Sequence, residues 1–380
     1  MEHILTKETA TSQSGLVDQT TNSPWTFDGQ SAPLTTHGPL VTLIDGRSFS
    51  LSATSGDISD QGPQGLFFLD TRLLKKFVLL VNGQPPEPLG YAQHGSYEAC
   101  FVSRHHDSQR KADTPVVVFR SRNVGQGMTE VITIKNHGDN PVELLVSLHA
   151  KADFADLFAV KEGQTTSSTT STSVVKGKEL WFHNQVETTP HKATTVEIEV
   201  SSQPEPHNVQ PNIMSWNVTI EPTQSWQTEL TVAPWLAGVR SGPLTSDSPL
   251  SASQKLANWN AKIPQIETNH PPLSVCAKSA LSDLASLRIF DPKRPDQPVV
   301  AAGAPWFMTL FGRDSLITSW MALLVDPDLA SGVLQTLARY QGTEVNEITE
   351  EQPGKIMHEM RFAGADSGSL DDGHLSLIHI

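Results

Sequence analysis

The chain has 380 residues, a length typical of two or three domains, and its 37% apolar and 18% charged residues are ordinary for a globular protein. Its net charge of −14 repels phosphate backbones and excludes nucleic acid as an expected partner, whereas a neutral polymer needs no charge attraction. The N-terminus lacks the apolar core of a signal peptide, and no run approaches the roughly 18 apolar residues of a membrane helix. We therefore expect a cytoplasmic protein without a membrane partner.

The first two thirds of the chain are rich in short β-type runs. Residues 1–36 are dominated by small polar residues and predict a disordered tail. From residue 37, runs typical of strands end at turn pairs such as Asp45-Gly46 and Asn82-Gly83. The strands expected here are 41–44, 49–51, 77–81, 116–120, 128–135, 142–150, 173–175, 180–182, 196–200, 214–220 and 226–233. This pattern predicts an antiparallel β-sandwich over residues 37–240.

Beyond about residue 251 the apolar period changes from two to about 3.6. Residues 241–271 read as a linker with a short helix at 253–260. Further helices are predicted at 272–290, 312–325 and 327–340. Strands followed by helices indicate separate domains rather than a parallel α/β sheet.

Residues 304–315 contain the first group of side chains that could carry chemistry. Trp306 and Phe307 precede Gly312, and Arg313 and Asp314 then open a helix. Aromatic faces can stack on pyranose rings, and charged planar groups bind vicinal hydroxyls through two hydrogen bonds. The alternative is structural: Asp314 caps the helix and Arg313 is only its neighbour.

A second group surrounds a Pro-Gly turn after the last predicted helix. It consists of Glu351, Lys355, His358, Glu359 and Arg361. A solvated charged loop is the alternative reading. One His beside one Glu lacks the HExxH spacing of a zinc helix, so no metal is expected.

A third segment, residues 62–72, contains no combination of residues that by itself indicates catalysis. We expect it to form a structural turn with a contact between Asp70 and Arg72. The two cysteines, Cys100 and Cys276, are too few for a disulfide framework or a zinc site.

These segments together resemble a known family. The sequence GDISD at 56–60, followed by GLFFLDTR at 65–72, looks like the N-terminal domain of bacterial glycogen-debranching (amylo-α-1,6-glucosidase-like) proteins. Residues 304–314 and 350–361 resemble the first loops of the glucoamylase-like (α/α)₆ toroid that follows it. The resemblance covers about residues 37–364. It implies a multidomain chain, β then α: an antiparallel β-sandwich followed by the first helices of an (α/α)₆ toroid over residues 272–364.

The resemblance also implies a function. The protein is expected to be a glycoside hydrolase of the debranching type that acts on an α-glucan oligo- or polysaccharide, with no cofactor, because water and two carboxylates suffice. Arg313 and Asp314 would grip the sugar at the cleavage subsite. The full set expected to bind substrate is Trp306, Phe307, Arg313, Asp314, Glu351, Lys355, His358 and Arg361. Glu359 is the local candidate for the catalytic acid, and the main acid and base are expected beyond the chain end.

The chain departs from the family at its C-terminal end. Twelve helices need on the order of 200 residues, whereas only about 110 lie between residues 253 and 364. Residues 365–380 read as a non-native or truncated end. We expect an inactive fragment in which Leu316, Ile317, Trp320 and Leu323 lack partners.

Two rival functions stay open. The sandwich could make the chain a non-catalytic carbohydrate-binding module, or the toroid could hydrolyse another glycoside, such as a mannosyl-glycerate or a trehalose-like substrate. The sugar, the linkage and the oligomeric state are not determined by the sequence.

Overall fold

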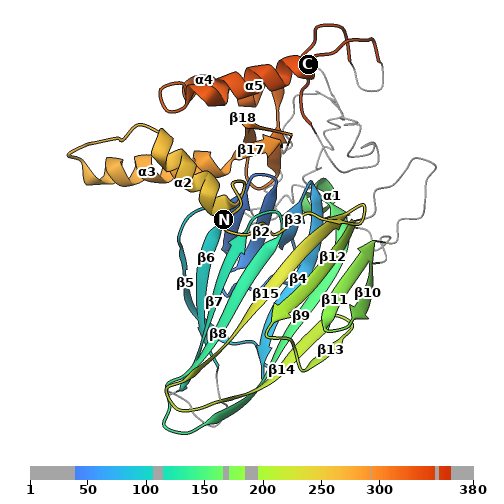
Figure 1. Cartoon of the computed structure of the whole chain (residues 1–380), viewed down its shortest axis with the longest axis vertical. Coiled ribbons are helices and arrows are strands. Elements are labelled where there is room, and N and C mark those ends of the chain that lie inside the picture. The colour runs from blue at the N-terminus through green and yellow to red at the C-terminus, as the bar shows by residue number, and fades with distance from the viewer. Residues whose placement is uncertain are drawn as a thin grey trace, which may run out of the picture. The chain divides into compact units, whose positions relative to one another are not determined.

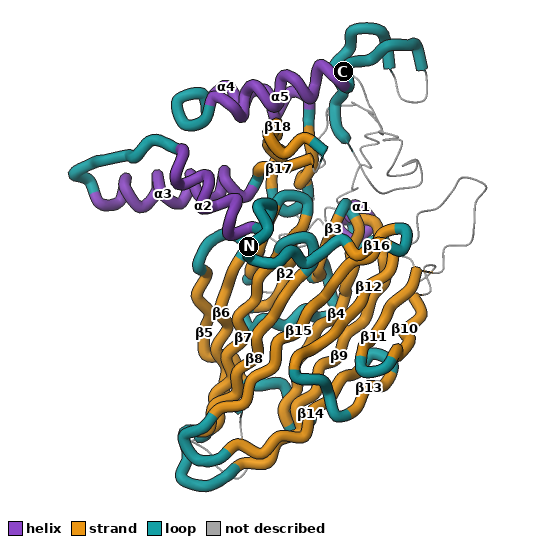
Figure 2. The backbone as a smooth tube through the Cα atoms, viewed as in Figure 1, coloured by secondary structure: helices purple, strands orange, loops and turns teal. Residues whose placement is uncertain are grey.

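The computed structural model describes residues 39–105, 114–165, 171–184, 196–291, 293–346 and 351–360. Figures 1 and 2 show how strands give way to helices along this part of the chain. The predicted tail at 1–36 and the predicted non-native end at 365–380 lie outside the described residues.

Two antiparallel sheets form the N-terminal part. In spatial order, the seven-stranded sheet contains β1 (Leu40–Asp45), β2 (Ser48–Ala53), β3 (Gly65–Phe68), β4 (Thr71–Val81), β9 (Val142–Asp156), β14 (Ile213–Ile220) and β13 (Asn208–Gln210). The nine-stranded sheet contains β10 (Ser171–Lys176), β11 (Glu179–Asn184), β12 (Val196–Gln203), β15 (Ser225–Leu236), β8 (Met128–Asn136), β7 (Val116–Val124), β6 (Glu98–Arg104) and β5 (Glu87–Gln93), with β16 (Val239–Arg240) paired to β15.

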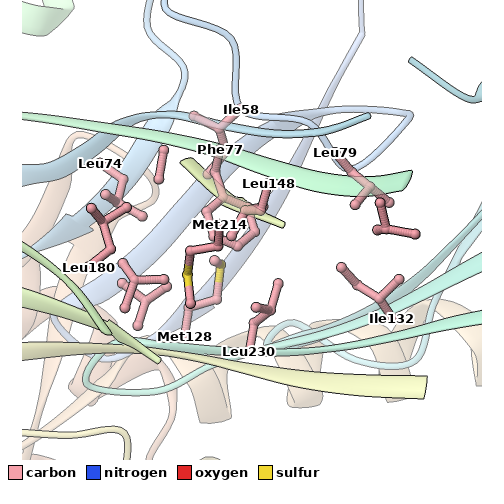
Figure 3. Close-up of a cluster of buried hydrophobic side chains, with 14 of the residues drawn as sticks. Ile58, Leu74, Phe77, Leu79, Met128, Ile132, Leu148, Leu180, Met214 and Leu230 are labelled. Atoms are coloured by element: carbon pink, nitrogen blue, oxygen red, sulfur yellow. The ribbon is translucent and has the colours of Figure 1, made fainter. Parts of the chain in front are cut away.

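The core of this part lies between the two sheets. Buried and less buried residues alternate along β7 and β8, as expected of strands with one face in a core. In Figure 3 the labelled side chains of the seven-stranded sheet include Leu74, Phe77, Leu79, Leu148 and Met214. They converge with those of the nine-stranded sheet, which are Met128, Ile132, Leu180 and Leu230. One continuous apolar cluster thus joins both sheets, and the predicted β-sandwich is confirmed.

Some strands are longer than predicted or were missed. β4 and β9 have 11 and 15 residues, whereas the sequence predicted only 77–81 and 142–150. The additional residues of these strands are buried on both faces of the sheet, so the sequence shows no clear alternation of apolar and polar residues there. β5 was missed because all seven of its residues are exposed and it contains Pro88 and Gly90, which are unfavourable in strands.

The C-terminal part mixes helices with a small sheet. Its helices are α2 (Ala252–Lys262), α3 (Pro271–Ser286), α4 (Gly312–Met321) and α5 (Pro327–Arg339), and a short helix α1 (Leu157–Lys161) follows β9 in the sandwich. A three-stranded antiparallel sheet contains β17 (Arg288–Asp291), β18 (Arg294–Gly303) and β19 (Phe307–Leu310). The sequence did not predict this sheet.

Two helix predictions require correction. The helix expected over 272–290 ends at Ser286, because Arg288 and Ile289 pair with Val300 and Val299 of β18. The helix expected over 312–325 ends at Met321. In the first case, pairing with the following strand β18 overrides the local helical period, and periodicity alone does not reveal this pairing. The helix predicted at 327–340 is confirmed by α5.

A toroid of helices is not evident within the described residues. On α4, Leu316 packs on the core, but Ile317 and Trp320 are 47% and 70% exposed, and Leu323 just beyond it is 43% exposed. The prediction of unpartnered apolar side chains is therefore confirmed for three of the four residues and wrong for Leu316. No helix of the described part is long and apolar enough to cross a membrane.

A second apolar cluster positions the candidate site. It contains Phe49 and Phe67 of the sandwich together with Trp306 and Met308 around β19. Further members are Leu157, Val160, Leu329, Val333, Met357 and Met360. Residues that are far apart in the sequence are thus held in one packed unit.

Candidate functional site

The two segments that the sequence singled out pair with each other. Phe311, directly after β19, forms an antiparallel bridge with Glu359. The backbone N–H of Gly312 donates to the carbonyl oxygen of His358 at 2.9 Å. Residues 304–314 and 351–360 are therefore joined as neighbouring strands of backbone.

The hydrogen bonds define which side chains share a face. Met360 N–H donates to the Leu310 carbonyl oxygen at 2.9 Å, so Phe311 and Glu359 are flanked by hydrogen bonds and exchange none themselves. Directly opposite residues of this kind have side chains on the same face and at the closer of the two ladder spacings. The candidate acid Glu359 thus lies on the face that also carries the Phe311 ring.

Gly312 makes this pairing possible. A Cβ atom there would collide with the carbonyl oxygen of Met357, which is rigid backbone. The Thr309 hydroxyl donates to the carbonyl oxygen of Met360 and adds a second tie between the two segments. Only glycine lets the two backbones approach so closely.

The Pro-Gly turn predicted in the second segment is confirmed. Lys355 N–H donates to the Gln352 carbonyl oxygen at 3.0 Å, and Gly354 has φ +86°, as required at the third position of a type II turn. Gly342 N–H donates to Lys355 at 2.8 Å and anchors the turn beside the end of α5. Lys355 itself is half-buried.

Glu351 organises the loop before this turn. Its Oε1 accepts the backbone N–H of Thr343 at 2.7 Å and that of Glu344 at 3.4 Å. In this structure the carboxylate therefore orders residues 343–344.

A row of rings and one cation runs along the paired segments. The Phe307 and Phe311 centroids are 5.9 Å apart, and the His358 ring meets Phe311 edge-on at 5.6 Å. Lys161 Nζ, from helix α1, lies 4.9 Å from the Phe307 centroid. We call Phe307, Phe311 and His358 the aromatic row. Phe307 is 39% exposed, so part of its ring is open to a ligand.

Trp306 differs from its neighbour Phe307. It is only 5% exposed, and its ring packs edge to face on Phe67 of β3, with centroids 6.2 Å apart. Its Nε1 has no hydrogen-bond partner among the described residues. A ring this buried acts through packing in this structure, and not as the open stacking face that the sequence suggested.

Arg313 and Asp314 lie in the first turn of α4. The N-cap of this helix is Phe311, and no side chain makes a capping hydrogen bond there. The interpretation of Asp314 as the capping residue is therefore wrong. Ser315 Oγ instead accepts the Phe311 N–H at 3.3 Å and donates to the Val300 carbonyl oxygen at 2.7 Å. Arg313 is exposed and Asp314 is half-buried.

Arg361, also predicted to bind sugar, lies outside the described residues. Lys161 was missed by the sequence analysis, because α1 is 5 residues long and carries no motif. Among the described residues, no three His, Cys, Asp or Glu side chains gather as they would around a metal ion.

Residues 62–72 form the β3–β4 hairpin. Leu69 and Asp70 have φ +49° and +60°, which is typical of a type I′ turn. The prediction that Arg72 contacts Asp70 was wrong. Arg72 pairs instead with Asp153 of β9 through two nitrogen atoms, and its Nε lies 3.1 Å from Oδ1.

A buried ion network anchors the GDISD segment. Arg120 contacts Asp57 at 2.5 Å and Glu130 at 2.7 Å, while Arg122 binds Glu130 and the Gly56 carbonyl oxygen. Burial alone would raise the pKa of the Glu130 carboxyl, but the two guanidinium groups outweigh burial and lower it.

Comparisons with known proteins agree with the sandwich. Residues 43–231 match a family model of the N-terminal domain of (some) glycogen debranching enzymes. The sandwich is thus related to those domains. No curated protein sequence matches the chain.

Solved structures with a similar fold include a putative kojibiose phosphorylase from human microbiome, with a TM-score of 0.53 and 10% identity over 79% of this chain. The chain spans 46% of that protein, and at this identity the likeness concerns the fold alone. A putative aldose 1-epimerase from Escherichia coli K12 has a TM-score of 0.32 and 10% identity over 52% of this chain and 99% of its own, too distant to support an argument. The domain family and the phosphorylase both belong to carbohydrate-active enzymes.

Proposed function

We propose that the protein is a glycoside hydrolase of the glycogen-debranching type that acts on α-glucan. The match of residues 43–231 to the N-terminal domain of such enzymes carries this proposal. The chemistry needs a saccharide, water and two carboxylates, and no cofactor.

The paired segments are the proposed place of the sugar. The open part of the Phe307 ring offers an apolar surface to one face of a pyranose, and Glu359 lies on the same face of the ladder as Phe311. Arg313 and Asp314 follow directly in the sequence and would bind sugar hydroxyls. Sugar contacts of Lys355, His358 and Arg361 belong to the same proposal.

Glu359 is the proposed general acid. As a carboxylic acid it would protonate the glycosidic oxygen of the leaving group. In an inverting enzyme a second carboxylate, about 6.5–9.5 Å away, would activate water on the opposite side of the sugar. Trp306 and Gly312 would act indirectly, by holding β19 and residues 351–360 in place.

Helices α3–α5 are proposed to begin an (α/α)₆ toroid over residues 272–364, with residues 241–271, which contain α2, as the linker. The exposed apolar side chains Ile317, Trp320 and Leu323 support this, because they present a surface on which further helices could pack.

An assay of the gene product tests the function. We expect glucose release from a branched limit dextrin, with kcat reduced about 10²- to 10⁴-fold by Glu359→Gln. The exposed Glu344 on the neighbouring loop provides the control Glu344→Gln, which should retain activity. No release of glucose by the wild type would contradict the proposal. Release of a sugar phosphate only in the presence of inorganic phosphate would replace hydrolysis by phosphorolysis.

A further inference from the structure

Helix α1 is held rigidly at the end of β9. Asp156 Oδ1 accepts the backbone N–H groups of Phe158 at 2.8 Å and Ala159 at 3.2 Å, which caps the helix. Leu157 and Val160 are 0% and 3% exposed and anchor the helix in the core. The side chain of Lys161, the last residue of α1, therefore extends from a backbone whose position is fixed.

The same core fixes β19. Leu157 and Val160 belong to the apolar cluster that contains Trp306 and Met308, the two residues that flank Phe307 in the sequence. Packing therefore sets the position of Lys161 relative to Phe307. Helix α1 of the sandwich and β19, which carries Phe307, therefore meet through a buried apolar core.

Two rings hold the ammonium group of Lys161. Its Nζ lies 4.9 Å from the Phe307 centroid and 5.6 Å from the Phe158 centroid, both within range of a cation–π interaction. A lysine side chain held in this way has already lost much of its rotamer entropy, so its N–H donors are preorganised for a ligand.

We propose that Lys161 is a sugar-binding residue, so that the sandwich itself completes the site on the paired segments. A pyranose packed on the open part of Phe307 would present hydroxyl oxygens at its edge, and the Lys161 ammonium group would donate to them. This inference rests on the proposed function, because it takes the ligand to be an α-glucan.

Maltohexaose binding to the 380-residue chain, measured by isothermal titration calorimetry, tests the inference. Lys161→Met keeps the aliphatic stem on Phe307 and removes the charge, so Kd should rise about 10- to 100-fold. Lys161→Arg keeps a cation with several donors and should bind more tightly than Lys161→Met. Lys176→Met is the matched control, because Lys176 Nζ also lies over a ring, 3.7 Å from the Trp181 centroid, but between strands β10 and β11 of the nine-stranded sheet. Its Kd should equal that of the wild type.

A second measurement uses only the wild type and does not depend on how the variants fold. Maltohexaose should slow the acetylation of Lys161 by acetic anhydride, read by mass spectrometry, and leave that of Lys176 unchanged. Wild-type affinity of a folded Lys161→Met chain, or equal acetylation of Lys161 with and without sugar, would overturn the inference.

The outcomes also separate this inference from the proposed function. If maltohexaose binds through Lys161 but the gene product releases no glucose, Lys161 stands as a binding residue and debranching hydrolysis fails. If glucose is released but Lys161→Met binds maltohexaose normally, debranching hydrolysis stands and Lys161 is not a binding residue. If the wild type binds no maltohexaose, the role of Lys161 falls.

Discussion

Phe67 in strand β3 and Trp306 before β19 pack edge to face, with centroids 6.2 Å apart and planes at 87°. Phe67 also stacks on Phe49 at 4.4 Å, and all three rings are at most 5% exposed. Phe67 of the sandwich and Trp306 of the C-terminal part therefore belong to one core, although they are 239 residues apart in the sequence.

Replacing Trp306 tests this shared core. Trp306→Ala should lower the free energy of unfolding by about 3–5 kcal/mol, because it leaves a cavity beside Phe67. Phe307→Ala, at the exposed neighbour, should cost much less. Urea denaturation followed by circular dichroism measures both. A double-mutant cycle with Phe67→Leu should give a coupling of about 0.5–1.5 kcal/mol, and additive effects would contradict the contact.

Gly312→Ala should separate the two paired segments. The new methyl group would collide with the Met357 carbonyl oxygen, so residues 351–360 must move and maltohexaose binding should be lost. Gly303→Ala is the control, because a Cβ atom there meets nothing within 4 Å. Hydrogen exchange of the Gly312 and Met360 amides, which are bonded across the ladder, should accelerate in the variant. Normal protection of Met360 in a folded Gly312→Ala chain would refute the steric argument.

Asp314→Asn distinguishes sugar binding from helix stabilisation. Because α4 has no side-chain cap, loss of the charge should cost only about 0.3–1 kcal/mol through the helix dipole. If Asp314 grips the sugar, kcat/KM of the gene product on its glucan should fall roughly 30- to 1000-fold. Asp328→Asn, at a first-turn aspartate of α5, should leave kcat/KM unchanged. Near-normal turnover by Asp314→Asn would argue against a sugar contact.

The ion network around Glu130 predicts a pH dependence of stability. The folded-state pKa of Glu130 is below its ordinary value of 4.5, so its carboxylate stabilises the fold above that pH. This contribution is lost as pH falls from 4.5 through the folded-state pKa. Glu130→Gln should cost about 3–5 kcal/mol near neutral pH, because Arg120 and Arg122 stay buried.

Urea titrations between about pH 7 and about pH 3 measure this effect. The difference between wild type and Glu130→Gln should shrink on the acid side. Glu87→Gln, at an exposed pair with Arg104, serves as the control and should leave the free energy of unfolding nearly unchanged, because solvent screens such a pair. A difference that stays constant with pH would show that Glu130 is not the titrating group.

Trp320, on the exposed side of α4, is expected to promote aggregation in solution. Trp320→Gln changes a side chain that is 70% exposed, so unfolding free energy should shift by no more than about 0.5 kcal/mol. Aggregation should decrease, because a large apolar group leaves the surface. Light scattering against concentration measures this, and unchanged scattering would mean that the α4 face does not cause association.

Local signals in the sequence were sufficient for much of the fold. Alternation along residues 128–135 and 214–220 predicted strands of the sandwich, since a strand with one buried face must alternate. Asp326 and Pro327 predicted where α5 begins, because capping and the fixed φ of proline act within one turn. The motifs at 56–60 and 65–72 predicted a debranching-type N-terminal domain, and the family model of that domain matches residues 43–231.

Only the tertiary structure decided which residues meet. Strand β17 lies where the sequence shows helical period, since its stability comes from pairing with β18. Trp306 and Phe307 are adjacent and similar in chemistry, yet one is buried on Phe67 and the other is open beside Lys161. Burial and side-chain contacts depend on segments hundreds of residues apart, whereas propensity and capping depend on neighbours within a few residues. The sequence by itself therefore determined many of the elements and the chemical groups, and the packing of β3, α1 and β19 into one core decided which of those groups are buried and which are exposed.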